Sequence, residues 1–424
     1  MVDDLFSIQT RLGGKPAVGF RTSVREWSFP SKLTLASTHA VHPYVASMNP
    51  HLARALIKTV NPQKNGKILD PFVGGGAVLV EALRNGYPAQ GIDVNPLGVL
   101  ISKVKTTYVP QDALWKSYGA ILEGYLRARA DSLSFPAESR IDYWFRKDSI
   151  EVLTKLASTI SQIEEENVRD VFKVILSGTV RDVSLTYRGE IRLRRLQGDD
   201  LAQFKPDVIK KFAQRSKLTI SRVSSLPESP IIDVSLGNAT NMEFESDLFS
   251  AIVCSPPYGD DRNGVGYFQF SKNMLYWLGY SSEEIAQHKK QFLGAVKSNK
   301  KAPDSPTLNS AIESIIQQPV KSNPKAVEEC IAFYSDLFVA LREMTRVCSG
   351  RIAIVIGNRT LSKTLIDNGQ IIIELMQNLD YKLLESRSRI INKKRIAVMQ
   401  PGGGARDVSG GGLINAERTL IFGS

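Results

Sequence analysis

The sequence predicts an α/β protein with a Rossmann-like, doubly wound and mostly parallel β-sheet that is split by a mainly helical insertion. Residues 67–95 have the pattern of a short strand, a glycine-rich turn, an apolar helix and a second strand that ends in an acid, which is typical of the nucleotide-binding half of such a sheet. Residues 251–254 form an apolar, β-rich run that stops at two prolines, as a buried strand does at the edge of a parallel sheet. Between these regions, residues 110–230 carry helical periodicity.

These patterns divide the 424-residue chain into three parts. Residues 1–109 provide the first part of the sheet and residues 231–424 complete it, with the insertion at 110–230 between them. Residues 283–325 are polar, lysine-bearing and interrupted by prolines, so we expect a long loop there.

The first part begins its regular structure at Asn49, which is a good helix cap because its side chain can accept a hydrogen bond from a free backbone N–H group. Pro50 follows at the first helical position, where its fixed φ is favourable. The expected elements are a helix over 51–60, a strand over 67–70, a helix over 78–84 that stops at Gly86, and a strand over 89–93.

The third part continues the alternation of strands and helices. A third strand is expected over 231–236, and the apolar run before Ser255 is the fourth. The remaining expected elements are an aromatic helix through Trp277, a helix over 332–347, a buried strand over 350–356, a helix over 368–379 and closing strands over 381–388 and 419–422.

Composition excludes several classes of protein. Hydrophobic residues make up 42% of the chain and charged residues 23%, which is enough for an ordinary globular core. Cys254, Cys330 and Cys348 are far apart and form no C-x-x-C pair, which argues against a disulfide framework and a zinc site. No apolar run is long enough to span a bilayer, and residues 1–10 lack the pattern of a signal peptide. We therefore expect a cytoplasmic protein without membrane contact.

The first two strands indicate which nucleotide the sheet binds. The glycines Gly74, Gly75 and Gly76 do not have the G-x-G-x-x-G spacing, and Asp70 stands where a pyrophosphate would have to approach. An acid at that place suits a ligand with a positive amino group and no phosphate, which describes S-adenosylmethionine. Asp93, at the end of the second strand, suits the two ribose hydroxyls. The alternative is that the glycines only form a tight turn with positive φ.

The fourth strand leads into Ser255-Pro256-Pro257-Tyr258. Prolines cannot donate backbone hydrogen bonds, and each restricts the preceding residue to an extended conformation, so the chain leaves the sheet as a stiff loop. The Ser255 hydroxyl and two carbonyl groups would offer acceptors, and the Tyr258 ring a stacking face, to a planar heterocycle with an exocyclic amine. A Pro-Pro turn without a ligand is the alternative.

The net charge of +11 is concentrated in two segments. Residues 181–222 hold 11 Lys and Arg against 5 Asp and Glu, and residues 288–301 hold five Lys and no acid, so their excesses together equal the net charge. Confined positive charge of this kind predicts contact with a polyanion such as nucleic acid. The alternatives are a solvated lysine-rich surface for 288–301 and a salt-bridged helix or hairpin for the arginines of 179–196.

With these motifs placed, the sequence resembles the S-adenosylmethionine-dependent amino-methyltransferases of DNA, and more specifically the cytosine-N4 enzymes of restriction–modification systems. Residues 38–44 look like the family's N-terminal cofactor motif, 70–76 like its glycine motif, Asp93 like its ribose-binding acid, and 255–258 like its catalytic motif in the serine form. Residues 181–195, 259–278, 351–359 and 390–395, leading to 415–420, also resemble this group. The chain departs from the family at Asn238, where an acid is common, and at Ala77, which replaces a common threonine.

The resemblance implies a class I methyltransferase fold and a site-specific DNA methyltransferase that is cytosine-N4-specific. The implied cofactor is S-adenosyl-L-methionine, and the implied partner is double-stranded DNA, with the target cytosine flipped out of the helix onto Tyr258. A cognate restriction endonuclease acting on the same site is a further implied partner, without a stable complex. The implied catalytic residues are Ser255, Pro256, Pro257 and Tyr258; the cofactor-binding residues are His42, Pro43, Tyr44, Asp70, Pro71, Phe72, Gly74, Gly76, Asp93, Asn95 and Asn238; the DNA-binding residues are Arg181, Arg188, Arg192, Arg194, Arg195, Lys297, Lys300 and Lys301.

Four other functions are alternatives to this one. An adenine-N6 DNA methyltransferase shares the chemistry, but those enzymes more often have Asp or Asn at the position of Ser255. A guanine-N2 RNA methyltransferase and a catalytically idle nucleic-acid-binding protein are further alternatives. Cytosine-C5 methylation through Cys254 is disfavoured because that thiol lies in the buried part of a strand. His39 and His42 lack metal-ligand spacing, so no metal site is expected.

Overall fold

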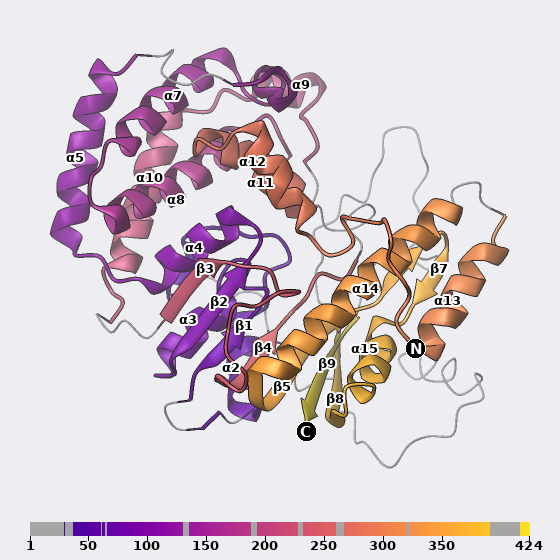
Figure 1. The fold of residues 1–424 in the computed structure, drawn as a ribbon. Coiled ribbons are helices and arrows are strands. Elements are labelled where there is room, and N and C mark those ends of the chain that lie inside the picture. The colour runs from indigo at the N-terminus through magenta and orange to yellow at the C-terminus, as the bar shows by residue number, and fades with distance from the viewer. Residues whose placement is uncertain are drawn as a thin grey trace.

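The computed structural model describes Phe29 and residues 37–60, 62–63, 66–129, 135–187, 193–227, 232–259, 267–319, 323–390 and 416–424. A seven-stranded sheet with the strand order β3-β2-β1-β4-β5-β9-β8 forms its centre (Figure 1). The strands are β1 (Ile68–Asp70), β2 (Ala89–Asp93), β3 (Ile232–Leu236), β4 (Phe249–Cys254), β5 (Cys348–Gly357), β8 (Lys382–Ile390) and β9 (Ala416–Gly423).

The first five strands of the sheet are parallel, and β9 runs antiparallel between β5 and β8. The chain order reverses direction at β1, where β2 and β3 lie on one side and β4 and β5 on the other. Ligands bind beyond the carboxyl ends of parallel strands at such a switch point. The predicted doubly wound, mostly parallel sheet is therefore confirmed.

Both faces of the central strands β1, β4 and β5 are largely buried, which explains the apolar runs in their sequences. Ile68, Ala251 and Val253 face helices α2 (Pro50–Val60) and α3 (Ala77–Arg84), and the Asn49 carboxamide caps α2 by accepting the His51 N–H at 2.9 Å. The alternate residues Leu69, Ile252, Cys254 and Ile354 face the other layer, which consists of α14 (Asn323–Val347) and α15 (Asn368–Gln377).

A group of helices with its own apolar core, which we call the helical lobe, lies beside the β3 edge of the sheet (upper left in Figure 1). Helix α4 (Pro96–Thr106) joins the lobe to the sheet because it packs against β2, β3 and α8. The other helices of the lobe are α5 (Gln111–Arg127), α6 (Ile141–Trp144), α7 (Lys147–Ser161), α8 (Glu166–Val183), α9 (Gly198–Gln203), α10 (Val208–Val223), α11 (Tyr267–Trp277) and α12 (Ser282–Lys290).

The long loop expected at 283–325 is wrong, because this segment contains two helices. Ser281 and Glu284 form a capping box that starts α12, and the Ser305 hydroxyl accepts the Leu308 N–H to start α13 (Pro306–Gln317). These local signals were overlooked because the segment is polar and carries prolines, although Pro306 occupies the favourable first turn of its helix. Helix α14 also begins at Asn323, earlier than the expected 332.

A short hairpin, β6 (Arg359–Leu361) with β7 (Thr364–Ile366), and two 3-10 turns, η3 (Ser37–Ala40) and η4 (Ala137–Ser139), complete the described elements. Among the described helices, none is both long enough and apolar enough to cross a bilayer.

Candidate cofactor and catalytic site

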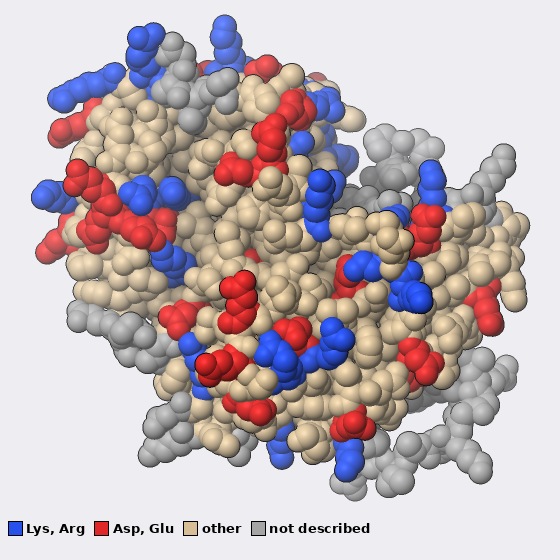
Figure 2. Space-filling model, in the orientation of Figure 1, with Lys and Arg blue, Asp and Glu red and all other residues tan. Residues whose placement is uncertain are grey.

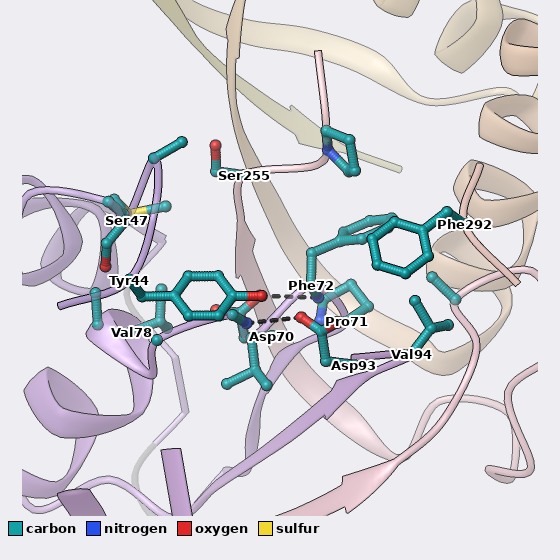
Figure 3. Close-up of a pocket in the computed structure, with 18 of the residues that line it drawn as sticks. Tyr44, Ser47, Asp70, Pro71, Phe72, Val78, Asp93, Val94, Ser255 and Phe292 are labelled. Carbon is teal, nitrogen blue, oxygen red and sulfur yellow. Dashed lines mark hydrogen bonds between the residues drawn. The ribbon is translucent and has the colours of Figure 1, made fainter. Parts of the chain in front are cut away.

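A pocket lies at the carboxyl ends of β1 to β4 and brings together residues that are far apart in the sequence (Figure 3). Tyr44 and Phe292 lie on opposite sides of Asp70 and Asp93 in this view, and Ser255 lies at the end of β4 beyond them. Of the cofactor-binding and catalytic residues expected from the sequence, those that line the pocket are Tyr44, Asp70, Pro71, Phe72, Gly74, Asp93, Asn238, Ser255 and Pro257.

The glycine turn after β1 follows a path that side chains would block. Gly76 has φ +77° and begins α3, and a Cβ on Gly75 would stand only 2.7 Å from the Tyr44 Cβ. The Gly74 N–H donates to the Asp93 carboxylate at 2.8 Å, which holds the turn against β2. The glycines form a tight turn with positive φ, and the same turn is part of the pocket wall. The structural and the ligand-binding interpretations of these glycines are therefore compatible.

Two buried acids give the pocket its electrostatic character. The pKa of Asp70 is raised to about 8, mainly by burial and to a smaller extent by nearby Asp93, against the lowering effect of the hydrogen bond from the Phe72 N–H at 3.1 Å. Burial also raises the pKa of Asp93 to about 6, although backbone N–H groups of Asn95, Gly74 and Val94 favour its ionised form. Within the described part of the chain, neither carboxylate has a cationic side chain within 4.0 Å.

Carboxyls that are buried without a cation are costly in their ionised form, and a positive ligand removes that cost. The amino group and the sulfonium of S-adenosylmethionine carry positive charge, and the pocket has apolar walls for an adenine ring in Phe72 and Val94. The residues present therefore fit this cofactor.

His42, Pro43, Gly76 and Asn95 do not line the pocket. His42 is buried beside it, with Nδ1 2.7 Å from the Pro43 carbonyl and Nε2 3.0 Å from the Ser177 hydroxyl. Because a carbonyl can only accept, Nδ1 carries the proton, and Ser177 donates to Nε2 of a neutral ring. Burial, with Arg215 and Lys105 nearby, holds the pKa of His42 well below its usual value.

Asn95 connects three parts of the site without entering the pocket. Its Nδ2 donates to the Tyr44 hydroxyl at 2.9 Å and to the Ser271 hydroxyl at 2.7 Å, and its Oδ1 accepts the Leu97 N–H at the start of α4. It thereby fixes Tyr44, in the pocket wall, relative to β2 and to α11. His39 anchors the same N-terminal segment through the buried carboxylate of Glu81 at 3.0 Å.

The motif after β4 is tied to neighbouring elements at several points. The Ser255 hydroxyl donates to the Val355 carbonyl on β5 at 3.1 Å, and the Tyr258 hydroxyl donates to Glu417 on β9 at 3.0 Å. The Tyr258 carbonyl accepts from the Asn368 carboxamide at 3.0 Å. Because its proton is directed to Val355, the Ser255 oxygen keeps its lone pairs available as an acceptor beside the pocket. Pro256 is buried and, like Tyr258, lies outside the pocket lining.

Cys254 sits at the end of β4 with no exposed surface. Burial, together with the charge of Asp70, holds the pKa of its thiol well above the usual value, so a reactive thiolate is disfavoured. Among the residues that the structure describes, no group of three or more His, Cys, Asp or Glu side chains is placed to hold a metal ion.

Sequence reasoning missed two parts of the pocket wall. Residues 45–48 follow Tyr44, and Gln291, Phe292 and Leu293 come from the turn after α12. The Phe292 ring packs edge-on against Phe268 of α11, with ring centroids 6.0 Å apart. Nothing local marks 291–293 as pocket residues, because only the tertiary fold brings them to the strand ends.

The predicted DNA-binding residues fall into different environments, and none lines the pocket. Arg181 is half-buried and donates to the Thr186 hydroxyl, whereas Arg194 and Arg195 lie over tyrosine rings. Lys300 forms an ion pair with Asp336, Lys297 is half-buried and Lys301 is exposed. Arg188 and Arg192 lie outside the described residues. On the face in Figure 2, basic and acidic side chains are interspersed.

Similar proteins agree with this geometry. Residues 39–93 match a family model described as an RMKL-like methyltransferase domain. Over 388 residues the chain is 29% identical to type II methyltransferase M.MvaI of Kocuria varians, and the match covers 85% of each chain. It is 24% identical over 295 residues to type II methyltransferase M.AvaI of Nostoc sp., covering 61% of this chain and 57% of that one. A 67-residue region, 16% of this chain and 12% of the relative, is 36% identical to type II methyltransferase M.MjaII of Methanocaldococcus jannaschii.

The Rossmann-like sheet and the matched methyltransferase domain confirm the expected class I methyltransferase fold. The predicted cofactor is also confirmed, because type II methyltransferases and this domain use S-adenosylmethionine. The fold, the matched methyltransferase domain and the similarity over 85% of the chain support a methyltransferase of the type II restriction–modification kind, with S-adenosylmethionine as its methyl donor.

Proposed function

We propose that the protein transfers a methyl group from S-adenosylmethionine to the exocyclic N4 of a flipped cytosine in double-stranded DNA. In this role it protects host DNA from a restriction endonuclease that cleaves the same site. The observation that carries the proposal is the Ser255 hydroxyl, whose proton goes to the Val355 carbonyl at 3.1 Å so that its oxygen accepts from an amine. The serine form of this motif favours cytosine-N4 over adenine-N6 transfer by resemblance.

The cytosine amine is a poor nucleophile because its lone pair is delocalised into the ring. The Ser255 oxygen and the Pro256 carbonyl would accept its two hydrogens and favour a more tetrahedral nitrogen. The lone pair would then be directed at the methyl group that the cofactor supplies, the electrons of the broken bond would stay on sulfur, and the nitrogen would pass one proton to water. When bound, the cofactor supplies an electrophilic methyl group on a sulfonium. Holding both reactants in line contributes most of the acceleration.

The remaining residues of the site would hold the reactants. Asp70 would face the amino group of the cofactor and Asp93 its ribose hydroxyls, and Asn238, which also lines the pocket, would lie near the adenine. Tyr258 would receive the face of the flipped base, and its hydroxyl is fixed by Glu417.

The proposal is tested by incubating the protein with unmethylated genomic DNA and S-adenosylmethionine, followed by digestion to nucleosides and mass spectrometry. We expect N4-methylcytosine. N6-methyladenine would preserve the fold and the mechanism but contradict the interpretation of Ser255. The absence of any methylated nucleoside, with intact binding of S-adenosylmethionine in calorimetry, would contradict a DNA substrate.

A further inference from the structure

Two arginines converge on one exposed tyrosine of the helical lobe. The guanidinium carbon of Arg140 lies 4.1 Å from the centre of the Tyr143 ring, and that of Arg195 lies 4.6 Å from it. Tyr143 keeps 39% of its surface exposed. Arg140 and Tyr143 come from the segment around η4 and α6, whereas Arg195 comes from the arginine-rich segment after α8. Only the tertiary structure brings them together.

The three residues are held in place by their surroundings. The Arg195 Nε donates to the Tyr143 carbonyl at 2.8 Å, and Arg195 pairs with Thr186 in an isolated β-bridge. Arg140 has φ +53° and ψ 39°, a left-handed conformation that costs a non-glycine residue about 1 kcal/mol or more. That conformation ends η4 and begins α6, so the backbone places the Arg140 side chain toward Tyr143.

The cluster rests on α11, which also reaches the cofactor site. The Phe135 and Phe145 rings, on either side of the cluster in sequence, pack on the buried Trp277 of α11 with centroids 4.5 Å and 5.7 Å away. Ser271 of the same helix accepts from Asn95 at 2.7 Å. The cluster is therefore attached to the structure that forms the cofactor pocket.

Charge distinguishes this cluster from other basic residues of the lobe. Arg215 pairs with Asp182 at 2.7 Å, and Lys103 pairs with Asp170 at 2.9 Å. Within the described ranges, neither Arg140 nor Arg195 has an acidic partner within 4.0 Å. Two like charges on one ring repel each other, and an anion that bridges them removes this cost.

We propose that Arg140, Tyr143 and Arg195 form a pre-ordered binding site for a phosphate of the duplex DNA backbone. Arginine forks match phosphate geometry, and fixing them on a ring before binding lowers the entropy lost on contact. Arg194, stacked 3.9 Å from the centre of the Tyr187 ring, extends the same arrangement. The site rests on the proposed DNA substrate and adds Arg140 and Tyr143, which sequence reasoning did not select.

The test measures the affinity of the full-length protein for a duplex oligonucleotide by fluorescence anisotropy at several salt concentrations. For Arg140→Gln we expect weaker binding and a logarithmic salt slope smaller by about 1, since one phosphate contact is lost. Tyr143→Leu removes no charge but should weaken binding by about as much as Arg140→Gln or more, because it frees both guanidinium groups. The double variant should lose less than the sum of the single losses.

Lys58→Gln is the matched control, because this exposed lysine of α2 packs with neither the helical lobe nor the pocket. S-adenosylmethionine affinity, measured by calorimetry, should stay unchanged in all variants and verifies their folding. If Tyr143→Leu leaves affinity and slope unchanged, or if Lys58→Gln matches Arg140→Gln, the proposal is overturned. A loss of affinity for single-stranded RNA without any loss for duplex DNA would assign the site to RNA and overturn the proposal. A wild type that binds duplex DNA through this cluster but forms no N4-methylcytosine would contradict the proposed reaction alone.

Discussion

Residues 181–222 and 288–301 hold similar excesses of positive charge, but the fold treats them differently. In the first segment, Arg194 and Arg195 lie over tyrosine rings at the surface of the helical lobe. In the second, Asp336 of α14 binds Lys300 and also accepts the Gly294 N–H at 2.9 Å. This fastens the turn whose residues 291–293 line the cofactor pocket. Arg195 and Lys300 thus differ in whether the tertiary structure of the described residues brings an acid within ion-pair distance, and we expect this difference to decide which of them is available to a polyanion.

The largest expected effect is on the rate of methyl transfer, and it should not involve either basic segment. Ser255→Ala should lower kcat by about 10²- to 10³-fold, because a pre-oriented polar group at the reacting nitrogen is lost. The dissociation constants of S-adenosylmethionine and DNA should change little, as measured by calorimetry and anisotropy. Unchanged turnover would remove Ser255 from the proposed mechanism.

The affinity of the pocket for S-adenosylmethionine should depend strongly on pH. The pKa of Asp70 is about 8 and that of Asp93 about 6, both above the usual value near 4, so acid favours their neutral forms in the free protein. The cationic amino group of the ligand requires Asp70 ionised, so binding should release up to about one proton and tighten up to about tenfold per pH unit from pH 5.5 to 7.5. Calorimetry in two buffers of different ionisation enthalpy counts those protons.

The same shifts predict how stability varies without ligand. A carboxyl whose pKa is higher in the folded protein than in the unfolded chain favours folding below about pH 4, and this contribution is lost as pH rises through its folded pKa. The free energy of unfolding should therefore fall toward pH 8. Asp70→Asn should flatten that decline and abolish S-adenosylmethionine binding. A decline of wild-type slope in this variant would assign the pH dependence to other groups.

The anchor of the 288–301 segment can be removed without touching the pocket lining. Asp336→Ala deletes the bonds to Gly294 and Lys300 and should weaken S-adenosylmethionine binding by about tenfold, the value of one charge-assisted hydrogen bond. The affinity for DNA should not decrease in this variant. Lys301→Gln, which alters an exposed neighbour in the same segment, is the control and should leave cofactor affinity at the wild-type value.

The smallest expected effect is a change in the salt dependence of DNA binding, which compares residues 181–222 with residues 288–301. Arg195→Gln should reduce the salt slope of DNA binding by about 1, whereas Lys300→Gln should leave the slope unchanged because its charge is already neutralised by Asp336. Anisotropy titrations at matched salt concentrations make the comparison. Equal slopes for the two variants would mean that the segments share one role.

The parts of the molecule that local sequence determines were predicted well. The strands through β5 follow from apolar runs and the start of α2 from Asn49-Pro50, while the acids Asp70 and Asp93 follow from their places at strand ends. These features depend on periodicity and capping within a few residues. The capping box at Ser281 was equally local, and its omission was an error of interpretation.

The remaining features depend on contacts between distant residues. No local pattern shows that Asp336 meets Lys300, that Asn95 meets Ser271, or that Gln291 reaches the cofactor pocket. The Arg140–Tyr143 stack with Arg195 joins segments that are about fifty residues apart and needs the lobe to be folded. The sequence therefore predicts the candidate reacting groups of this site, but not the side chains, such as Asn95 and Asp336, that position its walls.

The position of β9 has a consequence for how the protein becomes active during synthesis. β9 lies between β5 and β8, both of which precede it in the chain, and it supplies Glu417 to the Tyr258 hydroxyl. While residues 416–423 are still unmade, β5 and β8 lack the strand that joins them, and the Tyr258 hydroxyl lacks its acceptor. A nascent chain shorter than this cannot complete the sheet. We therefore expect a chain that ends before residue 416 to lack methyltransferase activity.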